Sequence, residues 1–181
     1  ATASAGTEVV LVIGAPGEDE YATVFDEEAD RWEKVCAEAG ARCTTIGRAA
    51  PGAVADRDRL RQCLEAEAPE GNDPLWLVLV GHGTFDGKDA KFNLRGPDVS
   101  AAELAQWLKP VHRPLAIIDT SSASAPFLSA LSAPGRVVIT ATRSGYEQNY
   151  SRFGRFFAAA GGYPQADLDK DGDTSLLETY L

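Results

Sequence analysis

The fold is decided by the stretch LWLVLV at residues 75–80, which is followed directly by Gly81, His82 and Gly83. An unbroken apolar run of this length, bounded by a turn signal, is typical of a strand that is buried on both faces. Similar runs are EVVLVI at 8–13, PLAII at 114–118 and RVVITA at 136–141, and ARCTTI at 41–46 is a shorter candidate. The sequence therefore predicts buried strands distributed along the whole chain.

Helical patterns separate these strands. Apolar residues at spacings of three and four mark a helix from Phe25 to Ala39, and Ser100 and Glu103 have the spacing of a capping box that opens another. Further helices are expected at 56–67, through Phe127 and Leu131, and at 153–160, with a short β segment at 90–94. Alternating strands and helices with short connections predict right-handed crossovers. The expected fold class is α/β, a three-layer α/β/α domain with a mostly parallel central sheet.

Composition limits the functions that the chain can have. Its 181 residues are 44% apolar and 24% charged, the balance of one globular domain, and its longest apolar run is far shorter than a membrane span. Acidic residues outnumber basic ones by 27 to 17, which gives a net charge of −10, and no cluster of Lys and Arg interrupts the excess. Neither nucleic acid as a partner nor a membrane span is therefore expected.

The cysteines and the first residues bear on the compartment. Three cysteines, Cys36, Cys43 and Cys63, are an odd number, so no disulfide framework is expected, and their positions favour small buried side chains. The chain contains no Met and opens with the small residues ATASAG. This opening favours export to the periplasm or the extracellular space.

Two strand ends carry residues suited to chemistry. His82 lies between two glycines after the strand at 75–80, and the strand at 114–118 runs into DTSSAS at residues 119–124, which we call the DTSSAS loop. In an open α/β sheet the functional crevice lies at the carboxyl ends of the strands. Taken singly, His82 also fits a structural loop residue, and the hydroxyl residues also fit helix caps.

Together, the two strand ends resemble the caspase and legumain fold group of cysteine peptidases, which includes the GPI transamidase catalytic subunit. In that group the second strand end reads Asp-Thr-Cys-Gln-Ala-Ser or Glu-Ala-Cys-Glu-Ser-Gly. The resemblance covers roughly residues 8–160. It implies that His82 is the family's histidine, that Ser121 stands where the family has its cysteine, and that the backbone amides of Gly83 and Ser121 form the oxyanion hole.

The resemblance also suggests a substrate pocket. In the family, the segment after the last core strand builds the specificity pocket, and here VVITATRSGYEQNYSRFG fills that place. Arg143, Ser144 and Glu147 are the candidates to line it. Glu147 would favour a basic residue in the substrate, although it also fits a surface acid beside Arg152.

The decisive departure from the family is Ser121. A serine hydroxyl has a far higher pKa than a thiol and needs a base in direct hydrogen-bond contact, whereas the caspase-type histidine stands apart from the nucleophile. The chain is therefore expected to be inactive as a peptidase, either as a natural pseudopeptidase or as a Cys-to-Ser variant. A serine hydrolase remains the alternative, with His82 as base and Asp119 or Asp86 as the orienting acid.

The end of the chain fits the twelve-residue loop of an EF-hand. Oxygen ligands stand at loop positions 1, 3, 5, 9 and 12, a glycine stands at position 6, and position 7 supplies a backbone carbonyl. The predicted Ca²⁺ ligands are Asp167, Asp169, Asp171, Asp173, Ser175 and Glu178. Neither a partner EF-hand nor a full exit helix accompanies this loop, so a modest affinity is expected.

These features predict two parts and three possible functions. Residues 1–162 form the caspase/legumain-like domain, and residues 163–181 form the calcium loop. The leading function is a silent peptidase homologue that binds a peptide or protein segment as well as calcium. An active hydrolase using Ser121 and His82, or a native Cys at position 121, is the first alternative, and a calcium-dependent structural module is the second.

Overall fold

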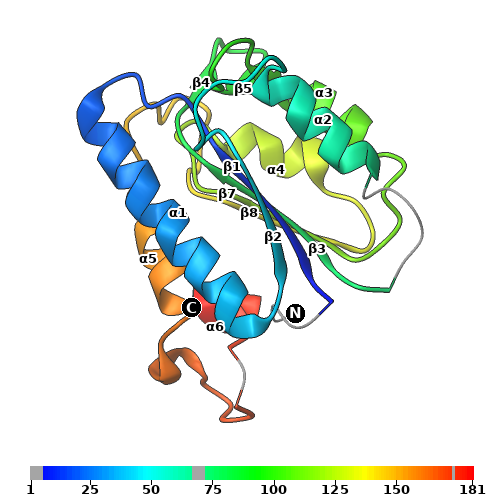
Figure 1. Cartoon of the computed structure of the whole chain (residues 1–181), viewed down its shortest axis with the longest axis vertical. Helices are drawn as coiled ribbons and strands as arrows, with labels where there is room; N and C mark the ends of the chain where they lie inside the picture. Colours follow the sequence, from blue (N-terminus) through cyan, green and yellow to red (C-terminus); the bar gives the residue numbers. More distant parts are fainter. Residues whose placement is uncertain (1–5, 67–71, 173) are drawn as a thin grey trace.

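A five-stranded parallel sheet forms the centre of the computed structural model, which describes residues 6–66, 72–172 and 174–181. Its strands are β1 (Glu8–Ile13), β2 (Arg42–Ile46), β3 (Leu75–Val80), β7 (Leu115–Asp119) and β8 (Arg136–Thr140). Their order is β2-β1-β3-β7-β8, and every neighbouring pair is parallel (Figure 1). β3 lies in the middle, and all six of its residues are buried, as its apolar sequence predicts.

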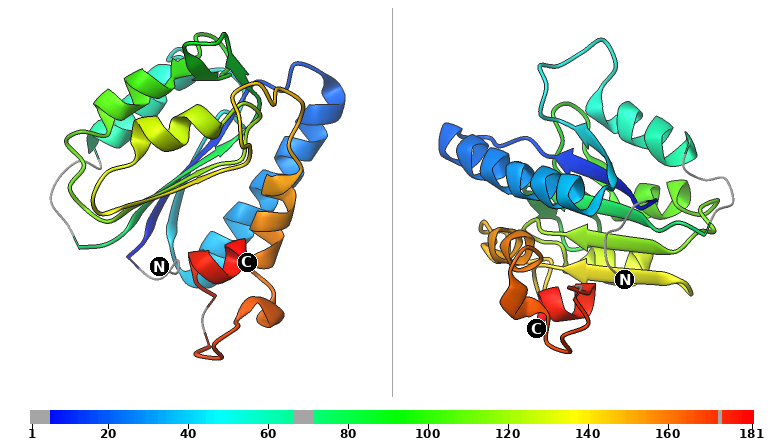
Figure 2. Two further views of the ribbon diagram at one scale, coloured as in Figure 1. Left: turned by 180° about the vertical axis from the view of Figure 1, so that it is seen from behind. Right: turned by 60° about the horizontal axis from the view of Figure 1, so that its bottom comes forward.

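Helices cover both faces of this sheet. They are α1 (Asp19–Ala39), α2 (Asp56–Ala66), α3 (Ala101–Trp107), α4 (Ala125–Leu131), α5 (Phe153–Ala160) and α6 (Leu176–Tyr180), with a 3₁₀ turn, η1, at Pro164–Ala166. One hydrophobic cluster joins the sheet to α1, α5 and α6, and the other joins it to α2, α3 and α4. Figure 2 shows the two helical layers on opposite sides of the sheet. The predicted three-layer α/β/α architecture is therefore confirmed.

A small antiparallel sheet stands beside the main one. It consists of β4 (Gly83–Phe85), β5 (Ala90–Phe92) and β6 (Val99–Ser100). The expected β segment at 90–94 is thus part of a separate sheet. The turn between β4 and β5 is held by Asp86 Oδ1, which accepts the amides of Lys88 and Asp89. β4 follows β3 after only two residues, so this sheet projects from the carboxyl end of β3.

Glycine allows close packing at that end. A Cβ at Gly81 would lie 3.0 Å from the Phe92 ring and 3.2 Å from the Cα of Gly14. These contacts are tighter than side chains normally make, so the loops after β1 and β3 approach each other only because both residues are glycines.

The C-terminal segment packs on the same core as the rest of the chain. Leu176 of α6 is 4% exposed and belongs to the hydrophobic cluster beneath α1 and α5. The division of the chain at residue 162 stays a prediction. Across the three described stretches, no helix combines the length and the apolar character needed to cross a membrane.

Candidate functional site

The DTSSAS loop meets the loop of His82 because β3 and β7 are parallel neighbours. Gly83 N–H donates to Ser122 Oγ at 3.0 Å, and Ser122 Oγ donates back to the Gly83 carbonyl at 3.2 Å. A Cβ at Gly83 would lie only 2.2 Å from the Ser122 carbonyl oxygen, so only glycine permits this approach. The topology thus brings Gly83 and Ser121 together, as the resemblance implies, but Ser122 occupies the Gly83 amide.

Ser121 is directed into the protein. Its residue is 0% exposed, its Oγ donates to Asp119 Oδ1 at 2.6 Å, and its backbone N–H donates to the same oxygen at 3.0 Å. Burial raises the pKa of Asp119 to about 6, although both hydrogen bonds from Ser121 act in the opposite direction. Asp119 Oδ2 is buried without a partner among the described residues. The Ser121 hydroxyl is therefore bound to a buried carboxyl group of its own loop rather than to His82.

His82 lies among aromatic rings. Its ring centroid is 4.6 Å from that of Tyr21, 5.1 Å from Phe25 and 6.3 Å from Tyr150. Desolvation lowers its pKa, while a hydrogen bond to the Pro16 backbone and the charge of Glu18 raise it less. The imidazole is consequently neutral at neutral pH, and its ring is packed against α1.

Glu28 is a buried acid behind this site that the sequence analysis missed. It lies on α1, is 2% exposed, and its Oε1 is 2.9 Å from Thr120 Oγ1, which also donates to the Leu79 carbonyl at 3.0 Å. Burial raises the pKa of Glu28 to about 7. A protonated Glu28 can donate to Thr120 while Thr120 donates to Leu79, so each group has a partner. Its spacing could have predicted this burial. Glu28 is three residues after Phe25 and four before Trp32, so it lies on the buried face of α1.

The predicted pocket segment lies over the DTSSAS loop. The Glu147 carbonyl accepts the Ala123 amide at 2.8 Å, and Glu147 Oε1 accepts the Arg143 amide at 3.1 Å. Ala123 has a positive φ of 53°, a conformation that costs energy for an L residue with a Cβ. Arg143 and Glu147 are exposed and Ser144 is half-buried. This segment thus contacts the DTSSAS loop. The sequence alone did not predict the contact.

Two aromatic residues complete that surface. The Tyr146 ring is 5.2 Å from the Phe85 ring of β4, in a T-shaped arrangement, and Tyr146 is 71% exposed. Gln148 Nε2 donates to the Phe85 carbonyl at 3.0 Å, which ties the segment to the small sheet. Neither aromatic residue was singled out from the sequence, because isolated aromatics carry no spacing signal.

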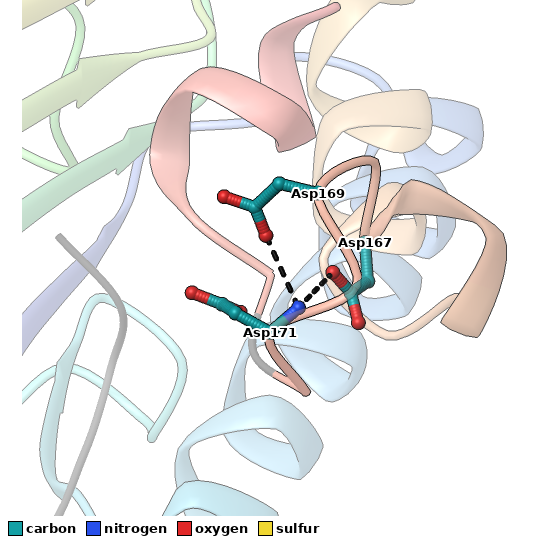
Figure 3. A group of neighbouring side chains, drawn as sticks. All are labelled: Asp167, Asp169 and Asp171. Carbon is teal, nitrogen blue, oxygen red and sulfur yellow. Dashed lines mark hydrogen bonds between the residues drawn. The ribbon is translucent and has the colours of Figure 1, made fainter.

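The described parts of the acidic loop, residues 167–172 and 174–178, lie near the amino ends of the strands, away from β4 and β5 (Figure 1). Oxygens of Asp167, Asp169 and Asp171 lie within 4.8 Å of one another. Figure 3 shows the Asp171 amide donating to both Asp167 Oδ1 and Asp169 Oδ1 at 3.2 Å. The predicted ligand Asp173 lies outside the described residues.

Two predicted ligands of that loop have other partners here. Ser175 caps α6 and forms a capping box with Glu178, whose Oε2 accepts the Ser175 amide at 2.8 Å. Glu178 Oε1 accepts the amides of Leu168 and Asp169, and these bonds, led by those to Ser175, lower its pKa to about 2. Glu178 is therefore an ionised group folded back over the start of the loop.

The fold is caspase-like. The chain is similar in structure to the Drosophila initiator caspase Dronc, as seen in a crystal structure, with a TM-score of 0.52 and 13% identity over 85% of this chain and 63% of that one. It is also similar to protein GSU0716 from Geobacter sulfurreducens, with a TM-score of 0.50 and 17% identity over 64% of this chain and 50% of that one. The chain thus spans between half and two thirds of these structures. No family model and no curated protein matches it.

Proposed function

We propose that this chain is a caspase-like domain without peptidase activity that binds a peptide or protein segment beside the DTSSAS loop. One observation gives the main support for the lack of activity. The two backbone amides expected to form an oxyanion hole already donate hydrogen bonds to acceptors within the protein. Gly83 N–H donates to Ser122 Oγ, and Ser121 N–H donates to Asp119 Oδ1. Acyl transfer needs such donors free to bind the developing oxyanion.

The nucleophile position supports the same proposal. An attacking hydroxyl must reach the substrate and must give its proton to a base within hydrogen-bond distance. Ser121 is fully buried and out of reach of a substrate, its hydroxyl donates a hydrogen bond to Asp119 rather than to His82, and the His82 ring is packed among aromatic side chains. The buried polar groups stabilise the loop in place of catalysing a reaction.

The binding surface is the segment after β8. The exposed Tyr146 rests on Phe85 and offers an aromatic platform, and the exposed side chains of Arg143 and Glu147 add both charge signs. Hydrogen bonds from Gln148 and Ala123 hold the segment in place, so little ordering is required when a partner binds. An extended peptide with a basic side chain near Glu147 suits this surface.

Turnover is tested with the unmodified chain and with the Ser121→Ala and Ser121→Cys variants, on fluorogenic peptides carrying Asp, Asn, Arg or Lys before the cleaved bond. We expect no cleavage by any of the three proteins. Cleavage by the unmodified chain that disappears in Ser121→Ala would replace the proposal with the active hydrolase. Cleavage by Ser121→Cys alone would contradict the argument from burial. It would mean that the unmodified chain is inactive only because residue 121 has an oxygen in place of a sulfur.

Binding is tested on an array of immobilised peptides that varies the central residue. Tyr146→Ala should weaken the retained signals by about tenfold, the loss of roughly 1.4 kcal/mol that an exposed aromatic contact supplies. The matched control is Tyr163→Ala, because Tyr163 is also exposed but lies outside this surface. Equal retention by both variants, or no retained peptide at all, would refute the binding proposal.

Calcium binding by the acidic loop is a second proposed function. The 4.8 Å limit on the oxygen separations of Asp167, Asp169 and Asp171 equals twice a typical Ca²⁺–O distance, so one ion can contact all three carboxylates. Asp167 and Gly172 also line a cavity of about 420 Å³ together with Trp32 of α1 and Trp76 of β3. Calcium would therefore stabilise the attachment of the C-terminal segment to the main core.

Titration calorimetry with CaCl₂ in excess MgCl₂ tests this function. We expect one binding event, an increase in melting temperature with CaCl₂, and loss of both in Asp169→Asn. Asp58→Asn, at an exposed acid on α2, is the control and should bind as the unmodified chain does. The absence of heat and of any thermal shift would refute calcium binding and leave the peptide proposal standing.

A further inference from the structure

Two cysteines meet where α1 passes into β2. Cys36 is in the last turn of α1 and is 2% exposed, and Cys43 is the second residue of β2. Gly40 has a left-handed φ of 66°, and the Ala41 amide donates to the Cys36 carbonyl at 2.9 Å, so the chain turns back at once. Cys43 then packs against the hydrophobic cluster that contains Cys36.

The turn places the two thiols on the same face of the sheet. Both side chains belong to the same hydrophobic cluster, each thiol affects the pKa of the other, and Cys43 Sγ is 3.9 Å from Thr45 Oγ1. The interaction between the thiols is the largest influence on both groups, and it lowers the pKa of Cys43 and raises that of Cys36. Cys43 is the more exposed of the two, so its thiolate is the nucleophile that an oxidant meets first.

We propose that Cys36 and Cys43 form a redox pair that oxidises to a disulfide and links α1 covalently to β2. The oxidant is a small disulfide such as oxidised glutathione. The Cys43 thiolate attacks one glutathione sulfur, a mixed disulfide forms, and the other glutathione leaves as a thiolate that takes a proton. Cys36 then loses its proton and attacks Cys43 Sγ, and the second glutathione leaves. Two protein thiols are oxidised, and one disulfide is reduced to two thiols.

The disulfide would attach the edge strand β2 to α1. β2 is the outer strand of the order β2-β1-β3-β7-β8, and Thr45 already joins it to α1 by donating to Glu33 Oε1 at 2.7 Å. The disulfide adds a covalent link at the same junction. In an oxidising compartment this link closes a short loop and protects the exposed strand from separating from α1.

The third cysteine serves as an internal control. Cys63 lies on α2, packed against the cluster on the opposite face of the sheet, and burial raises its pKa. It cannot reach the other two thiols without unfolding. A reaction confined to Cys36 and Cys43 is therefore distinguishable from general oxidation.

The test uses the full folded chain, incubated with oxidised glutathione, alkylated with iodoacetamide, denatured and digested with trypsin. We expect mass spectrometry to show residues 35–42 joined to residues 43–48, with Cys63 alkylated. The Cys63→Ser variant should form the same link and Cys43→Ser should not. The disulfide should stabilise the folded chain, but only modestly because the loop that it closes is short. We expect the melting temperature of the oxidised chain to exceed that of the reduced chain by about 5 °C.

Two results would overturn the proposal. The first is a stable glutathione adduct on Cys43 with Cys36 still free for alkylation, because the second step would then not occur in the folded protein. The second is a disulfide that includes Cys63 or joins two chains. Circular dichroism of Cys43→Ser confirms that the variant is folded, so a missing link in it reports the missing thiol.

Discussion

Replacing Glu28 with glutamine should remove a pH dependence from the stability of this protein. Glu28 is buried, and its pKa is raised from 4.5 to about 7 in the folded state. The folded chain therefore holds a proton between these values that the unfolded chain has lost. Stability contributed by this proton is fully present below pH 4.5 and is lost as the pH rises through 7. The glutamine side chain in Glu28→Gln keeps an amide that can donate to Thr120 Oγ1 but cannot ionise.

The size of this pH-dependent change in stability follows from the shift in the pKa of Glu28. A change from 4.5 to about 7 corresponds to about 3 kcal/mol, of which roughly 2 to 3 kcal/mol falls between about pH 5 and about pH 8. Urea unfolding at several pH values measures it. Between about pH 5 and about pH 8 the free energy of unfolding of the unmodified chain should fall by roughly 2 to 3 kcal/mol more than that of Glu28→Gln. Asp119, whose pKa is also raised, is present in both proteins and cancels in the difference.

The control is Glu27→Gln, which changes the neighbouring exposed residue of the same helix and removes only an ion pair with Arg31. Its pH dependence should follow that of the unmodified chain. Parallel curves for Glu28→Gln and the unmodified chain would refute the reasoning, because they would mean that Glu28 titrates alike in the folded and unfolded states.

Three further substitutions test the packing around the site. Ser100→Ala removes one half of the capping box with Glu103 and should cost about 1 kcal/mol in urea unfolding. Gly154→Ala places a Cβ 2.1 Å from Glu28 Oε1, so we expect a melting temperature lower by about 5 °C or more. Phe127→Ala empties a 1% exposed position of α4 and should cost about 3 to 5 kcal/mol in urea unfolding.

The main sheet and its helices follow from the sequence because burial on two faces demands unbroken apolar strands. β3 and the amphipathic α1 are examples in which local pattern and tertiary packing agree. Glu28 shows where the pattern fails: an acid is read as exposed, yet α1 buries it beside Thr120. The small sheet was also incompletely predicted, because strands of two or three residues carry almost no periodic signal.

Residue types and the resemblance were enough to propose candidate site residues, but they could not predict the hydrogen bonds of these residues. The resemblance implied that Gly83 and Ser121 lie together, and the structure brings the two residues together because β3 and β7 are adjacent parallel strands. Which hydroxyl would occupy the Gly83 amide depends on side-chain rotation after the backbone has folded. The structure gives that place to Ser122, a residue the sequence analysis assigned no role.

Serine at position 121 suits the buried environment better than a thiol would. A buried hydroxyl requires a hydrogen-bond partner, and a buried carboxyl such as Asp119 requires donors. Ser121 supplies Asp119 Oδ1 with two donors, whereas a thiol is a weak one. The Ser121 hydroxyl therefore forms a hydrogen bond that holds the loop closed. This gives a physical reason why serine is favoured at position 121 of this caspase-like fold, where the surrounding polar groups bind one another.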